Sequence, residues 1–526
     1  MGPQLPVGLT ALLWSGVALV VYMVISKILA QRQYAAEAAR RGAKPALVYP
    51  SILPLGFDHI YNSLKADREQ RFAPFVQERF EEMNVTTLRY YVLGEEIYQT
   101  IDPKNLQAML ATQFNDFALG PERRNNFFPM LGSGIFTLDG RGWEHSRAMI
   151  RPQFARDQIS DLELEERHVQ NMLLALPADK DGLIDVDLQP LFFRLTLDTA
   201  TEFLFGKSCD SQLHGLPDHD ATENPNDDGN IFATAFDKGQ SWLAMRSRFQ
   251  SLYWAVDTRD FRQACKQTQA FADQFVRRAL SKDRDEKELE KGGKEKYVFL
   301  DALAAQTQDP VELRSQLLNI LLGGRDTTAS LLGWLFYSLA RKPEIFQKLR
   351  NIILDEFGTY DDPHEITFAR LKSCQYLQFC NNETLRLYPV VPVNTRQAVR
   401  NTTLPRGGGP DGMSPIFVKK DQHVQYTVHA MHRRKEEWGD DANEYVPERW
   451  ENKRVGWEYL PFNGGPRICP GQQFALTESS YVTVRLMQRY DRIENRDPEP
   501  MAKHNLTLTN CSGTGTKVRL HEATHI

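Results

Sequence analysis

The sequence predicts a mainly α-helical protein with a minor β-sheet region, preceded by one transmembrane helix at its N-terminus. Helical patterns dominate the chain, and a few short segments carry the residue pattern of strands. An uncharged apolar run near the N-terminus predicts the membrane helix.

The apolar run from Val7 to Ile25 contains no charged residue. A helix needs ~20 apolar residues to cross the hydrocarbon core of a membrane. Lys27 and Arg32 follow the run and no basic residue precedes it, so the positive-inside rule places the rest of the chain in the cytosol. A cleaved signal peptide is the alternative, but it would have a basic start. We predict a single-pass anchor over residues 1–30.

Residues 31–55 are predicted to form a basic, proline-containing linker, because Pro45, Pro50 and Pro54 cannot continue a helix. The globular domain then spans residues 56–526, since no internal repeat and no second shift in composition marks another boundary. Two polar stretches within it, residues 210–230 and 281–296, are predicted to be surface loops.

Inside the domain, strand patterns occur at residues 89–102, 391–399 and 423–431. The longest helical pattern opens at Pro310 and continues to Lys342. Its middle is apolar on nearly all sides, so we expect this helix to pass through the centre of the domain.

Composition excludes several classes of protein. The formal net charge of -5 gives no basic surface for nucleic acid. The 6 cysteines form no CxxC pair, which is typical of a reducing compartment and not of a disulfide scaffold. Cys374 and Cys380 lack a second ligand pair at zinc spacing, and His429 with His432 lacks the glutamate of HExxH, so we expect no zinc site.

The strongest signal is the run Phe462-Asn-Gly-Gly-Pro-Arg-Ile-Cys469-Pro-Gly471. Cys469 precedes a helical pattern, and the N–H groups of a helix N-terminus favour a thiolate, which is the form that binds metal. Gly465 and Gly471 would let the backbone pass close to a flat ligand, and Arg467 would bind a carboxylate. The alternative is an ordinary buried cysteine in a tight loop.

This run resembles the haem-binding loop of the cytochrome P-450 family, and the resemblance implies the fold of that family. It implies haem b as cofactor, with Cys469 as the axial ligand of the iron and Phe462, Gly465 and Arg467 as cofactor-binding residues. It further implies a monooxygenase that inserts one oxygen atom of O2 into a C–H bond.

Other motifs of the family follow in the expected order. Asp326 and Thr327, in Gly-Gly-Arg-Asp-Thr-Thr, match the acid and alcohol that deliver protons during oxygen activation. The small residues and the hydroxyl are expected to loosen the helix there. A glycine-softened core helix with a satisfied threonine is the alternative.

Glu383 and Arg386 lie three residues apart on a helix, where they can pair, and the resemblance makes Arg449 the third member of a structural trio. From spacing alone, a surface salt bridge would explain the pair. Trp143, Arg147 and Arg396 match residues that bind the haem propionates.

The chain has no Walker A or dinucleotide fingerprint, so its reducing equivalents must come from another protein. The resemblance implies an NADPH-cytochrome P-450 reductase, a membrane-bound flavoprotein that would share the lipid bilayer of the endoplasmic reticulum.

The runs around Trp143, Trp334 and Cys469 resemble the fungal branch that hydroxylates n-alkanes and fatty acids at or near the chain end. An apolar substrate must be held by shape, so walls are expected from Phe114 to Phe136, from the central helix, from Val390 to Val393 and near Leu506. A tailoring monooxygenase of secondary metabolism is the alternative. A haem-thiolate isomerase or dehydratase, and a non-catalytic haem sensor or membrane adaptor, are further alternatives that would not need Asp326 and Thr327.

Overall fold

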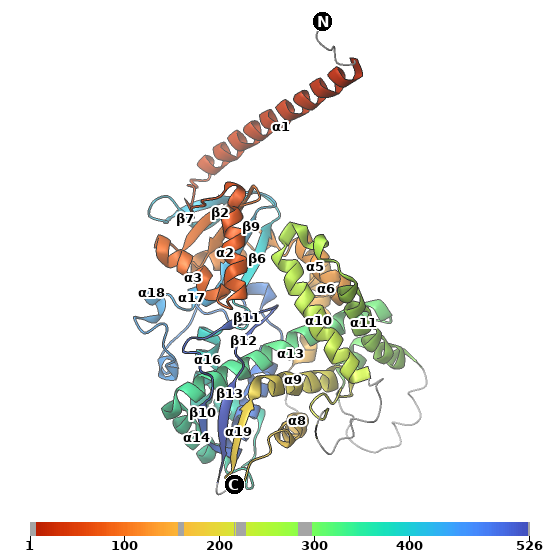
Figure 1. Ribbon diagram of the computed structural model, residues 1–526, viewed down its shortest axis with the longest axis vertical. Helices are drawn as coiled ribbons and strands as arrows, with labels where there is room; N and C mark the ends of the chain where they lie inside the picture. The colour runs from red at the N-terminus through yellow and green to blue at the C-terminus, as the bar shows by residue number, and fades with distance from the viewer. Residues whose placement is uncertain (1–6, 156–161, 215, 217–227, 282–296, 524–526) are drawn as a thin grey trace.

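The computed structural model describes residues 7–155, 162–214, 216, 228–281 and 297–523. In Figure 1, α1 projects from one end of the body, the long helix α13 crosses the middle, and the strands β2, β6, β7 and β9 lie to the left of α5, α6, α10 and α11. The helices are α1 Val7–Arg40, α2 Phe57–Arg68, α3 Phe72–Met83, α4 Pro103–Gln107, α5 Pro121–Leu131, α6 Gly140–Ile150, α8 Leu162–Leu174, α9 Leu188–Phe205, α10 Asp228–Arg248, α11 Arg259–Leu280, α12 Phe299–Ala304, α13 Pro310–Arg341, α14 Pro343–Phe357, α15 Phe368–Ser373, α16 Gln375–Leu387, α17 Val428–Met431, α18 Lys435–Trp438 and α19 Gln472–Arg489.

The predicted class is confirmed: the protein is mainly helical with small sheets. A six-stranded sheet has the order β1-β2-β3-β9-β6-β4, and β10-β13-β5, β7-β8 and β11-β12 form smaller sheets. The strands are β1 Leu47–Val48, β2 Thr87–Val92, β3 Glu95–Thr100, β4 Phe117–Ala118, β5 Leu183–Asp187, β6 Val393–Ala398, β7 Thr402–Gly408, β8 Ser414–Val418, β9 His423–Thr427, β10 Tyr490–Asn495, β11 His504–Leu506, β12 Asn510–Ser512 and β13 Lys517–Glu522.

The three predicted strand regions become β2 with β3, β6, and β9, and all of them pair in the large sheet. The end of the third region differs from the prediction, because Val428–Met431 forms the short helix α17. The Thr427 side chain caps this helix by accepting a hydrogen bond from the backbone N–H of Ala430.

The central helix α13 begins where the sequence predicts. Pro310 is its first residue, and the Asp309 carboxylate caps it by accepting from the backbone N–H of Val311 at 2.9 Å. Nearly every residue from Leu313 to Ala340 is buried, as the predicted apolar middle requires. The helix packs against α9, α11, α16 and α19.

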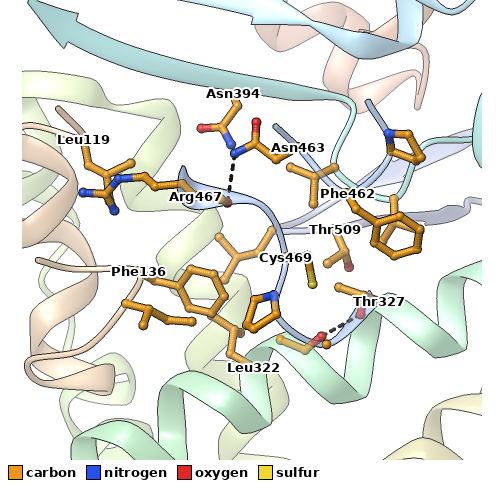
Figure 2. A pocket seen from close by; sticks show the side chains of 18 of the residues that line it. Leu119, Phe136, Leu322, Thr327, Asn394, Phe462, Asn463, Arg467, Cys469 and Thr509 are labelled. Carbon is orange, nitrogen blue, oxygen red and sulfur yellow. Dashed lines mark hydrogen bonds between the residues drawn. The ribbon is translucent and has the colours of Figure 1, made fainter. Parts of the chain in front are cut away.

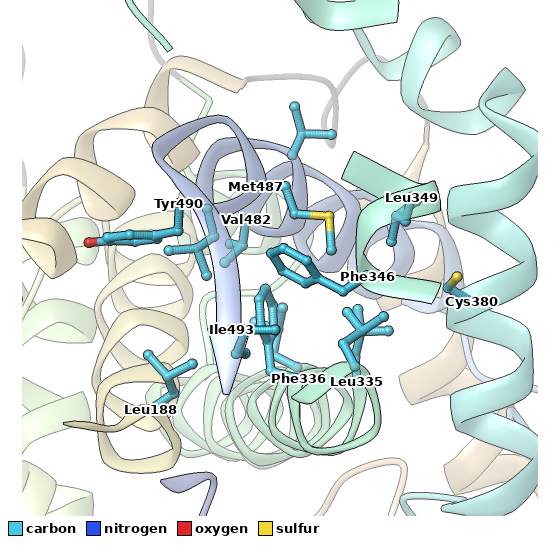
Figure 3. Close-up of a cluster of buried hydrophobic side chains, with 14 of the residues drawn as sticks. Leu188, Leu335, Phe336, Phe346, Leu349, Cys380, Val482, Met487, Tyr490 and Ile493 are labelled. Carbon is cyan, nitrogen blue, oxygen red and sulfur yellow. The ribbon is translucent and has the colours of Figure 1, made fainter. Parts of the chain in front are cut away.

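One large hydrophobic cluster holds the lower half of the body together. Leu335 and Phe336 of α13 meet Phe346 and Leu349 of α14 and Met487 of α19, as Figure 3 shows. All five side chains are almost completely buried. This cluster fixes α19, and therefore the segment that leads into it, against α13.

The predicted boundaries of the N-terminal segments differ from the structure. Residues 31–40 continue α1, because the sequence from Gln31 to Arg40 is rich in good helix formers and contains no proline. β1, within the predicted linker, pairs in parallel with β2. The Glu37 carboxylate accepts from Asn401 Nδ2 at 2.7 Å, so the end of α1 is docked on the domain.

Within α1, the stretch Trp14–Arg40 is long and apolar enough to cross a membrane, and its apolar window is not buried in the protein. The two polar stretches predicted as loops lie mostly outside the described residues. Asp228–Asn230, the end of the first stretch, already belong to α10.

Candidate active site

A cavity of about 520 Å³ lies between α13, the segment before α19, and β6. Most of its wall is apolar. Phe127, Phe136, Leu322, Val391 and Leu508 are among the residues that line it. Figure 2 shows Cys469 on the loop and Thr327 on α13 facing this same space.

The walls agree in part with the predicted ones. Phe136 and its neighbours, α13, and Val390, Val391 and Val393 line the cavity, as expected. The wall predicted near Leu506 is formed by the three residues Thr507–Thr509, whereas Phe114 does not line the cavity.

The loop before α19 holds Cys469 by backbone hydrogen bonds. The Cys469 N–H donates to the Phe462 carbonyl at 3.0 Å, and the Ile468 N–H donates to the Gly465 carbonyl at 3.0 Å. Phe462 and Arg467 also border the cavity. The loop therefore presents one sulfur at a fixed place on the cavity wall.

The electrostatics of Cys469 differ from the sequence-based expectation. Its side chain is exposed to the cavity but lies inside the protein, and this burial raises the pKa of the thiol. The Gly471 N–H and Arg147 act in the opposite direction, as a helix N-terminus should, but they do not outweigh burial. A thiolate at this place needs a further positive charge, and a metal ion bound to the sulfur would provide it.

Gly465 has a different reason for being glycine than the one predicted. Its φ is +65°, and a Cβ there would lie 1.8 Å from the backbone oxygen of Leu110. Leu110 belongs to the π-helical turn Ala108–Thr112. Gly465 is not among the residues that line the cavity, so it lets the loop approach this turn rather than a ligand.

Four guanidinium groups gather at the cavity. Arg147, Arg396 and Arg467 were singled out in the sequence, and Arg123 of α5 joins them. The Asn394 Oδ1 accepts from Arg123 Nη1 and from Arg396 Nη1, each at 3.2 Å. No motif marks Arg123 in the sequence, because only the fold brings α5 to β6.

The positive charges of these four arginines are only partly balanced by nearby carboxylates. Burial, together with the neighbouring arginines, lowers the pKa of Arg123 and of Arg467 to about 10 each. Asp139 pairs with Arg467 at 2.7 Å. The Arg467 guanidinium also lies 4.4 Å from the centre of the Trp143 ring, which is buried beside it. The group is suited to a ligand that carries carboxylates.

The acid and alcohol of α13 face different ways. Thr327 lines the cavity, and its hydroxyl donates to the Gly323 carbonyl at 2.6 Å. Asp326 is buried behind the wall, where burial raises its pKa to about 6 against the opposing effect of Arg325. The helix remains α-helical from Gly323 onward, so the predicted loosening is limited. It consists of the Thr327 hydroxyl bond to the Gly323 carbonyl, which competes with the backbone hydrogen bonds of the helix.

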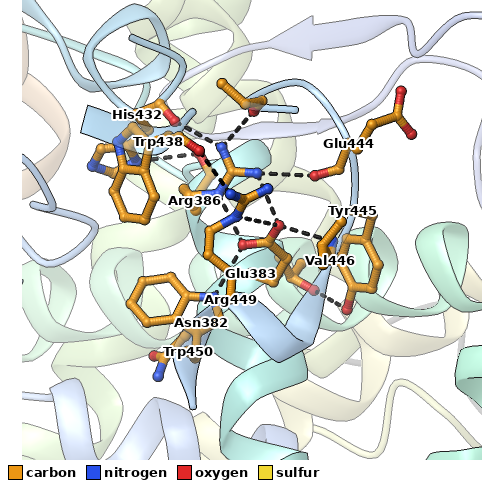
Figure 4. Close-up of polar contacts among 12 residues, drawn as sticks. Asn382, Glu383, Arg386, His432, Trp438, Glu444, Tyr445, Val446, Arg449 and Trp450 are labelled. Carbon is orange, nitrogen blue, oxygen red and sulfur yellow. Dashed lines mark hydrogen bonds and ion pairs between the residues drawn. The ribbon is translucent and has the colours of Figure 1, made fainter. Parts of the chain in front are cut away.

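Glu383, Arg386 and Arg449 meet in the structure (Figure 4). Arg386 forms two hydrogen bonds of 2.8 Å with the Glu383 carboxylate, and both side chains are fully buried. Arg449 Nε lies 3.5 Å from Glu383 Oε1. The surface salt bridge considered from spacing alone is therefore wrong.

This trio connects separate segments. Arg386 donates to the carbonyls of His432, Ala442 and Glu444, and the Trp450 indole N–H donates to Glu383 at 3.0 Å. The buried charges thus hold the chain between α17 and the Cys469 loop against α16.

Glu478 of α19 is a buried carboxyl that sequence reasoning missed. Burial raises its pKa to about 8, and the hydroxyls of Thr328 and Thr199 oppose this rise. Thr328 lines the cavity. A carboxyl with this pKa is mostly uncharged at neutral pH, which explains how it can lie between α9, α13 and α19.

Comparisons with known proteins agree with this geometry. The sequence model of the family described as Cytochrome P-450 matches residues 54–515. Cytochrome P-450 monooxygenase g430 from Fusarium sp is 54% identical over 97% of this chain and 90% of its own length. Cytochrome P-450 52A13 from Debaryomyces hansenii is 48% identical over 88% of each chain.

Among solved structures, the haem domain of cytochrome P-450DA superposes with a TM-score of 0.72, covering 92% of this chain and 99% of that chain. The two sequences are 19% identical, so this likeness concerns the fold.

Proposed function

This chain belongs to the cytochrome P-450 family, and on that premise we propose that it hydroxylates n-alkanes or fatty acids at or near the chain end. Members of the family are haem-dependent monooxygenases, which use haem b and electrons supplied from NADPH through a reductase. The observation that carries the proposal is the apolar cavity into which Cys469 and Thr327 both face.

The residues at the cavity fit haem b. We propose that Cys469 binds the iron and that Arg147, Arg396, Arg467 and Arg123 hold the two propionates, with Trp143 packed beside them. Burial disfavours both the Cys469 thiolate and the charged arginines. Bound haem would compensate, since its iron favours the thiolate and its propionates favour the guanidinium groups. When bound, haem supplies the activation of O2.

Arg123 gives a direct test of the cofactor site. We expect Arg123→Gln to release haem about 10-fold faster, because it removes a charge-assisted hydrogen bond to a carboxylate. Haem transfer to an excess of an acceptor protein measures the rate. Arg124→Gln, in the next and exposed position of α5, should keep the rate of the unaltered protein. Equal rates of haem release from both variants would show that Arg123 does not bind a propionate.

We propose that Asp326 and Thr327 deliver protons to the reaction. The Thr327 hydroxyl lies on the cavity wall, where it can donate a hydrogen bond to the bound reactants, and Asp326 replaces the proton from behind the wall. The Asp326 pKa of about 6 lets the carboxyl exchange protons near neutral pH.

Thr327→Ala should separate NADPH use from product formation. We expect NADPH consumption to continue while product per NADPH falls about 10-fold or more, because protons no longer arrive in order. Thr327→Ser keeps the hydroxyl and should keep the coupling. Measured product and NADPH in the same reaction give the ratio, and unchanged coupling in Thr327→Ala would contradict this role.

The cavity also supports the substrate class. Carbons without polar groups are held by shape and apolar contact, and Phe127, Phe136, Leu322, Val391 and Leu508 provide that surface. The resemblance of the runs around Trp143, Trp334 and Cys469 to fungal alkane and fatty-acid hydroxylases points the same way.

A second candidate is a tailoring monooxygenase of secondary metabolism. It is favoured by the polar side chains that also line the cavity, Asn126, Ser247, Thr507 and Thr509, since these could bind the oxygen atoms of a polyketide or terpenoid.

The proposal is tested with the full-length protein in membranes, together with NADPH and a reductase. Medium- and long-chain n-alkanes and fatty acids are offered, and mass spectrometry locates the new hydroxyl. Hydroxylation at or near the chain end is expected. Product only from oxygenated ring substrates would favour the tailoring enzyme, and product without NADPH and O2 would favour an isomerase or dehydratase.

We further propose that residues 1–30 anchor the protein in the endoplasmic reticulum membrane, with residues 56–526 in the cytosol. The apolar stretch within α1 and the basic residues after it support this arrangement. A membrane-bound NADPH-cytochrome P-450 reductase would then meet the protein in the same bilayer, which raises the effective concentration of both partners.

A further inference from the structure

A polar cluster behind the cavity wall joins the buried Asp326 to the molecular surface. Arg325 Nη1 lies 3.2 Å from Asp326 Oδ1 and also pairs with the carboxylate of Asp237 on α10. The side chains of Arg325 and Asp326 are each 6% exposed, whereas that of Asp237 is 58% exposed. One guanidinium is therefore shared between a buried carboxyl and a carboxylate in solvent.

The position of Arg325 is well defined. Its guanidinium carbon lies 5.5 Å from the centre of the Phe193 ring of α9 and 5.9 Å from that of Phe236 of α10. The side chain of Gln240 on α10 also acts on Asp326 and lowers its pKa. The cluster is thus built from α9, α10 and α13. Of these, α10 supplies Asp237, which competes with Asp326 for Arg325, and Gln240, which acts on Asp326.

We propose that Asp237 is a positioning residue for proton delivery: by sharing the Arg325 guanidinium, it leaves Asp326 free to take a proton from solvent and pass it to the cavity. This inference rests on the proposed role of Asp326 and Thr327. In each cycle the Asp326 carboxylate gains one proton from water and gives one to the Thr327 side, which restores its charge. Arg325 passes no proton, since guanidinium remains protonated.

The charges of the cluster explain why sharing matters. Burial raises the pKa of Asp326, Arg325 opposes this rise and Asp237 adds to it. Within the described part of the chain, Cys209 and Cys511 also face the cluster, and their thiols stay neutral because burial raises their pKa, to about 12 for Cys511. Of the three buried groups Asp326, Cys209 and Cys511, Asp326 is the one with a pKa near neutral pH.

Two variants should therefore shift the pKa of Asp326 in opposite directions. In Asp237→Asn, Arg325 pairs with Asp326 alone, so the pKa of Asp326 falls and the acid limb of the pH profile moves to lower pH. We expect kcat to fall about 3- to 10-fold with KM unchanged, and the solvent deuterium isotope effect to rise, because proton uptake becomes slower. In Arg325→Gln, Asp326 loses its cation, so its pKa rises and the acid limb moves to higher pH.

Asp273→Asn is the matched control. Asp273 of α11 pairs at 3.0 Å with Arg314, which lies on α13 as Arg325 does, and both side chains of that pair are about a quarter exposed. This variant removes an equivalent ion pair away from Asp326, so it should keep the pH profile and the isotope effect of the unaltered protein.

A measurement without turnover separates this inference from the proposed substrate. Infrared titration of the haem-loaded protein follows the carboxyl band of Asp326, which is assigned by its loss in Asp326→Asn. We expect a lower midpoint in Asp237→Asn, a higher one in Arg325→Gln and no change in Asp273→Asn. An unchanged midpoint in Asp237→Asn, or an equal shift in Asp273→Asn, would overturn the inference whether or not alkanes and fatty acids are substrates.

Discussion

Cys469→Ser should abolish hydroxylation while leaving the fold intact. Replacing partners that merely orient a metal ligand costs about 10- to 100-fold in activity or affinity, so losing the ligand itself should cost more than about 100-fold. Serine keeps the size of the side chain and the Cys469 backbone hydrogen bond to Phe462, but its hydroxyl does not ionise at working pH and cannot replace a thiolate. NADPH-dependent product formation, normalised to folded protein, measures the effect.

Cys511→Ser is the control for this variant. Cys511 is a buried cysteine of β12, close in sequence to Thr509 of the cavity wall, and it should tolerate the change with activity retained. Activity in Cys469→Ser comparable to that of Cys511→Ser would show that the sulfur of Cys469 is not part of the reaction.

Glu383→Ala should have the second large effect, on stability rather than chemistry. Arg386 would be left as a buried charge without its carboxylate, and breaking a fully buried ion pair in this way costs about 3–5 kcal/mol in the free energy of unfolding. That is a large part of the stability of a typical domain, about 5–15 kcal/mol. Chemical denaturation of the detergent-solubilised, haem-loaded protein, followed by tryptophan fluorescence, measures the difference.

Glu78→Ala provides the comparison. Glu78 pairs with Arg71 at 2.5 Å, but both side chains are 42% exposed, so this change should cost about 0–1 kcal/mol. If Glu383→Ala cost no more than Glu78→Ala, the buried trio would not be what holds the Cys469 loop against α16.

The fold class and the central helix could be predicted because their signals are local. Pro310 marks the start of α13, and the strand pattern at residues 89–102 marks β2 and β3. The strands β10 and β13 were missed because they pair with each other, and β13 with β5, across segments that lie far apart in the chain. The strands β11 and β12 were missed because each has only three residues.

The candidate site was predictable where chemistry and spacing coincide in a short motif, as in the Cys469 loop and in Asp326-Thr327. It was not predictable where the fold alone creates the neighbourhood. Arg123, Asp237 and Glu478 have predicted roles only because the fold brings their helices, α5, α10 and α19, to the cavity or its wall. Gly465 shows the same limit, because the contact that requires glycine is with Leu110, more than three hundred residues earlier.

The central claim, that Cys469 is the ligand of a haem iron in this cavity, is tested most directly by X-ray absorption at the iron edge of the purified haem-loaded protein. We predict one sulfur atom in the first coordination shell, absent in Cys469→Ser and retained in Cys511→Ser. A first shell without sulfur in the unaltered protein, or a sulfur that persists in Cys469→Ser, would contradict the account.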